Sequence, residues 1–372
     1  MTSLVPSSNI MLVFACISAL AWLGFAAEKT KVGKMLTGLF CTAGSAIVLS
    51  NMGVLPFQSQ AYEFVMTYLV PMAIPLFLFR VNLKEIFQET GRTIIAFTIG
   101  AFTTVIGIVI CVSFLDLGPL ESDLAGLFAA GYIGGALNFA SASEAIQFPD
   151  PTLLSAGIAA DGLAGFIYIM VLAVLPSVQF LTKVFGQEPS TNAVTIDNDK
   201  QPITLFSIIS LLAASALIVS IGNLLSAWLG MPSYAILFIT AISLLPSTLF
   251  ANQLKGVNGG FDLGMICTYL FFAAVGASAN LTVLLQVAPT IMLFAILVIV
   301  IHAVLLFPIA RAFKLSLGEV IIASNACILG PTTAAALAAA RGWRHLVTPG
   351  LLAGLFGYAI GTFIGVTVAA ML

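Results

Sequence analysis

The stretch FAAGYIGGALNFASASEAIQFPDP, from Phe128 to Pro151, places a Gly-Gly pair in the middle of an apolar segment. A second stretch, ASNACILGPTTAAALAAARGW, from Ala323, places Gly330-Pro331 at the corresponding point of another apolar segment. Glycine lowers helix propensity and proline removes a backbone donor, so both segments are predicted to be helices that break near their centres. What surrounds these two breaks decides the fold and the function that the sequence predicts.

The composition is that of a protein whose solvent is lipid. Of 372 residues, 60% are hydrophobic and 8% are charged, and the mean hydropathy is +1.13. A soluble domain carries about 25% charged residues, so no soluble core could bury this much apolar surface. The net charge of −2 and the lack of a basic run exclude nucleic acid as a partner. The five cysteines are far apart in apolar runs, without metal-ligand spacing, and are interpreted as buried hydrophobic residues.

Apolar segments recur along the whole chain, and each approaches the roughly 20 residues that a spanning helix needs. We therefore expect an all-α polytopic membrane protein of about 11–12 transmembrane helices, with the lipid bilayer as its partner. The first charges follow the first segment, which favours a retained first span with its N-terminus outside over a cleaved signal peptide. The predicted spans are Ile10–Ala27, Met35–Leu55, Phe64–Phe79, Thr93–Leu115, Leu124–Ile146, Leu153–Leu181, Ile203–Leu229, Ser233–Phe250, Leu263–Ala279, Ala288–Ala310, Val320–Ala340 and Leu346–Leu372.

A polar linker, residues 182–202, divides one integral membrane domain into two halves, residues 1–181 and 203–372. Short matches recur in the same order in both halves. MTYL recurs as CTYL, AGYIGGALNFAS matches NACILGPTTAAA, and LLSAGIAADGLAGFI matches GLLAGLFGYAIGTFI. Internal duplication at a steady offset is typical of secondary transporters, so we expect two structural repeats, each with a broken helix.

The orientation of the repeats stays open at this point. Six spans in each half would make the repeats parallel, whereas inverted repeats need an odd number, so that one candidate span would have to be re-entrant or fail to cross. Basic residues of the first half agree on one side of the membrane. Arg311 and Lys314 join that side only if the repeats are inverted.

The two breaks predict a binding site. Backbone polar groups in lipid need partners, so a broken helix survives only inside protein or beside a watery cavity. Paired broken helices point to the substrate site of a transporter, and their half-helix N-termini favour an anion. The alternatives are close helix packing at the glycines, and capping or interhelical hydrogen bonds at the polar residues. The predicted substrate-binding residues are Gly134, Gly135, Asn138, Ser141, Ser324, Asn325, Gly330, Thr332 and Thr333.

Carboxylates deep in spans are functional hypotheses, because a charge at bilayer depth costs at least about 2.5–3.5 kcal/mol. Glu144 shares a helix face with Asn138 and Ser141, and Asp161 lies in AGIAADGLAGF. Asn138, Glu144 and Asp161 are the predicted Na⁺ or H⁺ site, with a structural hydrogen bond of a neutral carboxyl as the alternative. Bound Na⁺ is the one cofactor that we consider. The deep His302 is interpreted as a packed, hydrogen-bonded residue, with a proton relay as its alternative.

Motifs of nucleotide motors, zinc proteases and serine hydrolases are absent from the sequence, and no nucleophile-and-base pair is visible. We therefore expect no enzymatic activity. No Lys or Arg lies deep in a span, so an anionic solute would be held by backbone N–H groups, amides and hydroxyls.

Several blocks together resemble a known family. PLFLFRVNLKEIFQETGRT, GGALNFASASEA, AGIAADG, LFFAAVGASANL and the Gly330-Pro331 block are similar to the YjcL-like membrane proteins, domain-of-unknown-function family 819, over nearly the whole chain. The resemblance implies a multi-pass protein of the bacterial cytoplasmic membrane. More distantly, paired broken helices resemble those of bile-acid/sodium symporters and sodium/proton antiporters, a fold-level analogy. The adjacent Asp-Asp pair and deep Lys of electrogenic antiporters are missing.

The function that the sequence predicts is secondary active transport. We expect symport of a small anionic or zwitterionic solute with Na⁺ or H⁺, by a core of broken helices that moves against an outer panel, in a monomer or a homodimer. A cation/proton antiporter that uses Asp161 and Glu144 is the alternative, and a non-transporting membrane scaffold is the third. The sequence names neither the solute nor the coupling ion.

Overall fold

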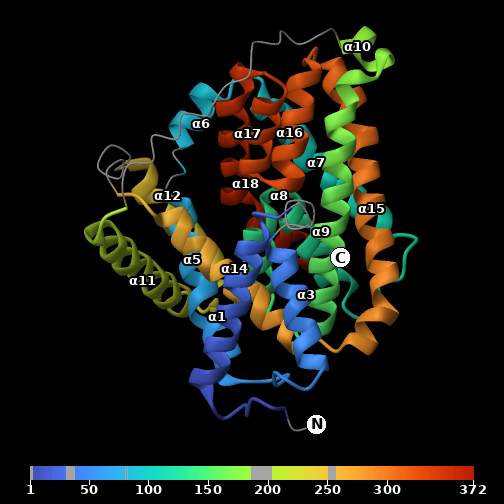
Figure 1. Ribbon diagram of the computed structural model, residues 1–372. Helices are drawn as coiled ribbons and strands as arrows, with labels where there is room; N and C mark the ends of the chain where they lie inside the picture. Colours follow the sequence, from blue (N-terminus) through green and yellow to red (C-terminus); the bar gives the residue numbers. More distant parts are fainter. Residues whose placement is uncertain (1–2, 31–37, 80, 82, 186–202, 250–256) are drawn as a thin grey trace.

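The computed structural model describes residues 3–30, 38–79, 81, 83–185, 203–249 and 257–372 (Figure 1). This part of the chain is built from α-helices with short 3₁₀ and π-helical turns and contains no β-strand, which confirms the all-α prediction. Of the predicted linker, residues 182–202, the structure describes residues 182–185 as the end of a helix, and residues 186–202 lie outside the described residues. The boundary that it draws between the halves therefore stays a prediction.

The helices follow the apolar segments closely. In the first half they are α1 (Ile10–Ala27), α3 (Gly38–Asn51), α4 (Gln60–Phe64), a π-helical turn (Val65–Leu69), α5 (Val70–Leu78), α6 (Leu83–Glu89), α7 (Thr93–Val112), α8 (Glu121–Ala145), α9 (Pro151–Val174), a 3₁₀ turn (Leu175–Ser177) and α10 (Gln179–Phe185). In the second half they are α11 (Leu205–Trp228), a 3₁₀ turn (Pro232–Tyr234), α12 (Ala235–Leu249), α14 (Gly260–Ser278), α15 (Leu281–Ala312), α16 (Leu317–Leu329), α17 (Pro331–Ala340) and α18 (Arg344–Met371).

Helix lengths support a polytopic membrane protein. Among the described residues, nine helices are long and apolar enough to cross a membrane, and three shorter apolar helices accompany them. Burial separates the helices that face lipid from those in the interior. In α8, 94% of the apolar window is buried, against 22% in α1 and 28% in α11. The helix that carries the Gly-Gly pair is therefore the most enclosed of the long helices.

Local caps explain where one helix departs from prediction. The structure begins α15 at Leu281, several residues before the predicted start at Ala288. Asn280 accepts hydrogen bonds at its side-chain oxygen from the backbone N–H groups of Thr282 and Val283, so the helix starts directly after this N-cap. Pro289, which the prediction placed near the beginning of the span, lies inside the helix.

The two ends of α15 carry different contacts. At its start, Leu281 donates its backbone N–H to Asn51 Oδ1 at 2.9 Å, and Asn280 donates to Thr152 Oγ1 at 3.1 Å. These bonds tie the ends of α3 and α14 to the beginning of α9. The start of α15 therefore lies where α9 begins.

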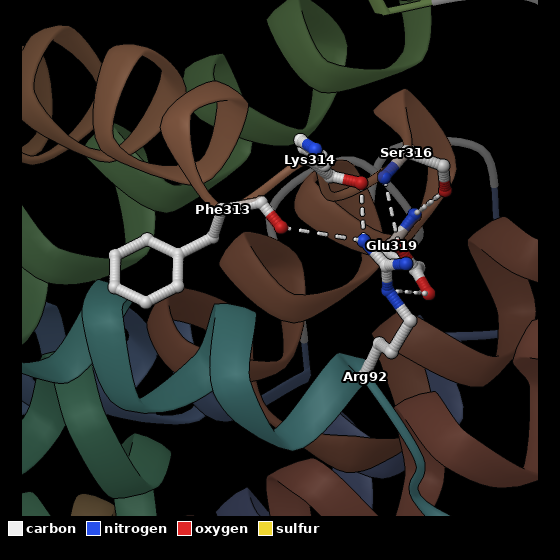
Figure 2. Close-up of polar contacts among 5 residues, drawn as sticks. All are labelled: Arg92, Phe313, Lys314, Ser316 and Glu319. Atoms are coloured by element: carbon white, nitrogen blue, oxygen red, sulfur yellow. Dashed lines mark hydrogen bonds and ion pairs between the residues drawn. The ribbon is translucent and has the colours of Figure 1, made fainter.

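At the other end of α15, Arg92 packs against the turn that leads into α16 (Figure 2). Its guanidinium donates to the backbone oxygens of Phe313 and Lys314 and lies 3.5 Å from the Glu319 carboxylate. Glu319 and Ser316 form a capping box that starts α16. This ion pair joins the beginning of α7 to the beginning of α16.

Candidate functional site

Both predicted breaks are present and share one backbone conformation. Gly135 has φ 70° and ψ −171°, and Gly330 has φ 95° and ψ −178°. Only glycine adopts this region without strain. The sequence therefore predicted correctly where the two helices break.

The first break reverses the chain. A Cβ atom added at Gly131 would lie 3.5 Å from the Cβ of Phe139, and the rings of Phe128 and Phe139 are 5.8 Å apart. In a continuous helix, residues 131 and 139 would be about 12 Å apart along the axis. α8 is therefore a hairpin, here called the first hairpin, whose first arm ends at Gly134 and whose second arm begins at Ala136.

The second break also reverses the chain. A Cβ added at Gly350 of α18 would contact side chains of both Ile322 in α16 and Ala334 in α17, at 2.5 and 3.5 Å. A continuous helix would hold those two residues about 18 Å apart. α16 and α17 lie side by side (Figure 1) and form the second hairpin, residues 317–340.

The hairpins open at opposite ends of the molecule. The first opens next to the start of α9, where Thr152 contacts Asn280 at the beginning of α15. The second opens at the end of α15, where Glu319 pairs with Arg92. The predicted segments Leu124–Ile146 and Val320–Ala340 therefore fold back at their glycines instead of running through as kinked helices.

The tips of the two hairpins meet beside α18. A Cβ added at Gly135 would lie 4.0 Å from the Cα of Gly330 and 3.8 Å from Cε1 of Tyr358. A Cβ added at Gly330 would lie 4.0 Å from the Tyr358 hydroxyl oxygen. Cys327 in the second hairpin donates to the backbone oxygen of Tyr132 in the first, with Sγ and O 3.0 Å apart. The breaks thus approach each other, as the sequence predicted.

Glycines let α18 approach the first hairpin closely. A Cβ added at Gly357 would lie 2.2 Å from the backbone oxygen of Ile133, and one at Gly365 would lie 2.6 Å from that of Gly126. Small residues at such contacts bring helix backbones together in membrane proteins. Close helix packing, which was the alternative explanation for the glycines, therefore applies along the first arm. The break at Gly135 is present as well.

A cavity of about 210 Å³ lies at the tips. Its wall joins both hairpins to α3, α9 and α14. The lining residues are Leu39, Phe40, Gly135, Ala136, Ile158, Asp161, Gly162, Phe166, Ile169, Phe272, Ile328, Leu329 and Thr333. Of the predicted site residues, Gly135, Asp161 and Thr333 are therefore brought together at one cavity.

Other predicted residues of the first hairpin serve its packing. Asn138 donates from Nδ2 to the Tyr358 backbone oxygen at 3.1 Å and to Thr362 Oγ1 at 2.9 Å, while its Oδ1 has no partner. Ser141 is buried and its hydroxyl has no partner among the described residues. Glu144 is partly buried near the end of the second arm and does not line the cavity.

In the second hairpin too, some predicted residues lie away from the cavity, and Thr333 lines it. Asn325 is fully buried, and neither its amide oxygen nor its amide nitrogen has a hydrogen-bond partner among the described residues. Thr332 is exposed, and Thr333 donates to the Gly330 backbone oxygen at 2.9 Å. Ser324 belongs to a separate polar network around His302.

His302 is fully buried and hydrogen-bonded on both ring nitrogens. Nδ1 lies 3.1 Å from the Gly100 backbone oxygen and 2.9 Å from Thr104 Oγ1, and Nε2 lies 2.8 Å from Ser324 Oγ. Because a carbonyl can only accept, the Gly100 bond assigns the ring proton to Nδ1. Nε2 then accepts from Ser324, whose oxygen accepts from Tyr168 at 2.6 Å. This is the packed, hydrogen-bonded histidine of the sequence interpretation.

The predicted cation site is brought together only in part. Asp161 lines the cavity, and neither Asn138 nor Glu144 does. Among the described residues, no group of three His, Cys, Asp or Glu side chains could hold a metal ion. Of the described residues that line the cavity, Asp161 is the one with a charged side chain.

Two tyrosines of the site were not predicted from the sequence. Tyr358 lies at both tips. Tyr132 is fully buried, its hydroxyl has no hydrogen-bond partner in the described part of the chain, and it is in electrostatic range of Asp161. A signal for Tyr358 was available, because the match of LLSAGIAADGLAGFI with GLLAGLFGYAIGTFI puts Tyr358 opposite Asp161. Tyr132 had no such signal, since an aromatic residue in an apolar run usually belongs to a core.

Comparisons with known proteins agree with the resemblance seen in the sequence blocks. A family model described as "Protein of unknown function (DUF819)" matches residues 12–372. The "Uncharacterized membrane protein YjcL" of Bacillus subtilis (strain 168) is 30% identical over 386 residues, which cover 98% of this chain and 97% of that protein. The more distant likeness to bile-acid/sodium symporters stays a prediction.

Proposed function

The chain belongs to the DUF819 family of proteins of unknown function, and we propose that it is a secondary active transporter. It is a multi-pass membrane protein, as its apolar helices and the name of its relative indicate. The proposed activity is symport of a small anionic or zwitterionic solute with Na⁺ or H⁺. The proposed location is the bacterial cytoplasmic membrane.

The meeting of two hairpin tips at a cavity carries this proposal. Irregular backbone within a membrane protein is tolerated where it is enclosed in protein or lines a cavity. Transporters place substrate sites at such interrupted helices, in the interface between their repeats. Gly135 and Thr333 bring one tip each to the same cavity wall. A scaffold protein would have no need of two broken helices whose turns face a shared cavity.

The arms that begin at the tips favour an anionic group. The first N–H groups of a helix lack partners within the helix, and the dipole is positive at that end. The second arm of the first hairpin begins at Ala136, and α17 begins at Pro331. Both starts lie at the meeting point, so two positive helix ends converge near the cavity. Asn325 adds a buried, unpartnered amide five positions before Gly330.

Asp161 is the residue that we propose binds the positive charge at this site. A carboxylate in an enclosed, apolar place needs a cation or a proton to offset its charge. That partner is either the coupling ion or a positive group of the solute. In both cases a positive charge at Asp161 would favour an anionic group at the tips. Where that charge is a separate coupling ion, the ion and the solute would each tighten the binding of the other.

The arrangement of hairpins supports inverted repeats. Once the hairpins are removed from the predicted spans, an odd number of other spans remains in each half, which is the condition for inversion. The opposite openings of the two hairpins agree with it. We propose a core of both hairpins with α7, α15 and α18, and an outer panel that includes α1 and α11. A homodimer through the panel is part of the same proposal.

A cation/proton antiporter is the second candidate, and Asp161 is the observation that favours it. An antiporter needs a carboxylate that binds a cation and a proton in turn, in a place reached by both. Asp161 lines the cavity and forms no ion pair with any described residue. The apolar surroundings and the helix ends at the tips favour symport.

A thermal-shift screen of the purified protein tests the proposal. The protein would be heated with small carboxylates and amino acids, with and without Na⁺, at several pH values. Stabilisation by an organic solute supports symport, and uptake of that solute into proteoliposomes down an imposed Na⁺ or pH gradient completes the test. A response to cations and pH alone would favour antiport. No response of any kind would contradict transport.

Asp161→Asn is the diagnostic variant, with Glu144→Gln as its matched control. Both changes remove one carboxylate from a predicted span and preserve side-chain size. We expect Asp161→Asn to abolish gradient-driven uptake while the protein still folds, and Glu144→Gln to retain uptake, because Glu144 does not line the cavity. Equal uptake by the two variants would show that the cavity is not the transport site.

A further inference from the structure

The cavity at the hairpin tips combines one negative charge with apolar walls. Asp161 lies among Phe40, Phe166 and Phe272, with the aliphatic side chains of α9 and α16 beside them. Ligand sites are mostly apolar, with a few polar groups that fix orientation. The chemistry of this wall therefore describes the solute in more detail than the proposed function does.

Among the described residues, Asp161 has no positively charged partner. Asp161 forms no ion pair or hydrogen bond there, and no Lys, Arg or His side chain lines the cavity. A bare metal cation is a poor match, because hard cations require several oxygen ligands and the wall offers the Asp161 carboxylate, the Thr333 hydroxyl and backbone. An ammonium group suits this wall better, since aromatic faces attract it as the carboxylate does.

The other pole of the cavity suits a carboxylate. Gly135, Ala136 and Thr333 form the part of the wall where the second arms begin. These helix starts present unpaired N–H groups and the positive ends of two dipoles. One wall therefore carries a negative side chain and positive backbone at different points.

The size of the cavity limits the solute. Its volume of about 210 Å³ lies below the roughly 300–1,000 Å³ of sites for drug-sized ligands. This space suits a small aliphatic or aromatic amino acid rather than a nucleotide.

We propose that the solute is an α-amino-acid-like zwitterion with an apolar side chain. Its ammonium group pairs with Asp161, its carboxylate meets the helix starts at Ala136 and Thr333, and its side chain lies against Phe40, Phe166 and Phe272. This inference rests on the proposed transport function and narrows it. Asp161 then binds the solute, and the coupling ion binds elsewhere.

Binding to the purified full chain in nanodiscs tests the pairing of charges. The probes are L-valine, L-leucine and L-phenylalanine, together with two analogues of leucine. One analogue, 4-methylpentanoate, lacks the ammonium group, and the other, isoamylamine, lacks the carboxylate. Calorimetry should show an affinity for at least one amino acid that is about 30-fold or more above that of either analogue, as expected when one partner of an enclosed charge pair is deleted.

Variants locate the ammonium group. Asp161→Asn should weaken amino-acid binding by about 30-fold or more and should not weaken the binding of 4-methylpentanoate, because that analogue has no ammonium group to pair with Asp161. Asp161→Glu should restore part of the affinity, and Asp262→Asn should keep all of it, because Asp262 is an exposed carboxylate at the start of α14 that does not line the cavity. Unchanged amino-acid binding in a folded Asp161→Asn protein would overturn the assignment.

The outcomes separate this inference from the proposed function. Binding of 4-methylpentanoate alone would reject the zwitterion and leave anion symport standing. Binding of isoamylamine alone would reject the zwitterion and the anionic solute together. If none of the probes binds, the inference is wrong, while gradient-driven uptake of another solute would still support transport.

Discussion

The two hairpins share a turn and differ in what holds them. Gly135 and Gly330 have nearly the same backbone angles, and both tips reach Tyr358. The first arm of the second hairpin, α16, is held by hydrogen bonds from other helices. The first arm of the first hairpin is held by close glycine contacts with α18. The same reversal is thus supported by a polar network in one half and by backbone packing in the other.

In the second arms the situation is reversed, because here the first hairpin has the hydrogen bonds to another helix. Asn138 and Thr333 occupy matching positions, three residues after the glycine of each tip. Asn138 reaches across to Tyr358 and Thr362 of α18, whereas Thr333 bonds only to its own turn at Gly330. Among the described residues, no side chain of α17 makes a hydrogen bond to another helix. We therefore expect α17 to be the arm that separates most easily from the rest of the core.

Removal of His302 should produce the largest effect. His302→Ala deletes the partner of Ser324 and Thr104 and leaves a cavity between α15 and α16. The free energy of unfolding should fall by about 2–4 kcal/mol, from lost packing and unsatisfied hydroxyls. Equilibrium unfolding in mixed micelles measures this. His345→Ala is the matched control, since His345 is exposed and is the other histidine of the chain. Equal losses in the two variants would show that the network does not anchor α16.

A methyl group added at either tip should produce the next largest loss of stability. Gly135→Ala and Gly330→Ala should each cost about 1–3 kcal/mol, because alanine is strained in this backbone region. Steric clash contributes little, as the nearest atoms lie 3.8 and 4.0 Å from the added carbon. Both variants should also lose solute-dependent stabilisation in a thermal-shift assay.

Gly118→Ala separates backbone strain from the tip itself. Gly118 also has a positive φ, 87°, and nothing lies within 4 Å of an added carbon there. This control should lose some stability and keep the response to solute. A normal response in both tip variants would mean that the tips do not bind the solute.

The sequence predicted the positions of the breaks but not the reversal of the chain. Glycine propensity locates Gly135 and Gly330, and propensity is a local property. Whether a broken helix continues or folds back depends on the helix that receives its second arm, and Thr362 of α18 lies 224 residues after Asn138. The contact of Asn138 with Thr362 therefore carries no signal in the sequence around either residue. The same reason explains why Asn138 and Glu144 were grouped with Asp161, which alone of the three lines the cavity.

The contrast between the second arms can be removed by one substitution. Asn138→Ala deletes two hydrogen bonds to α18 and should cost about 1–2 kcal/mol, while Thr333→Ala should cost less, because it deletes a bond within its own turn. Hydrogen exchange by mass spectrometry should show that amides of α17 exchange faster than those of residues 137–145. Asn138→Ala should bring the two arms closer in rate. Faster exchange in the first hairpin of the unaltered protein would reverse the comparison.

The ion pair at the open end of the second hairpin should have the smallest effect. Arg92 has 53% of its side chain exposed, so its pairing with Glu319 is expected to contribute less than about 1 kcal/mol and to weaken as salt is added. Arg92→Gln should therefore shift the unfolding midpoint slightly, and the shift should shrink at high ionic strength.

Glu319→Gln separates the ion pair from the capping box that it shares. Glu319 also accepts from the backbone N–H of Ser316 at 2.7 Å, and a glutamine oxygen can still accept that bond (Figure 2). If the ion pair is the main contact, Arg92→Gln and Glu319→Gln should cost the same. Glu319→Ala should cost about 1 kcal/mol more, through loss of the cap. Glu121→Ala is the comparison in the first hairpin, where the carboxylate accepts from the Leu117 backbone N–H at 3.0 Å without an ion pair. A salt-dependent loss in Glu121→Ala would show that the two open ends are stabilised alike, so that the difference between the hairpins lies only in their arms.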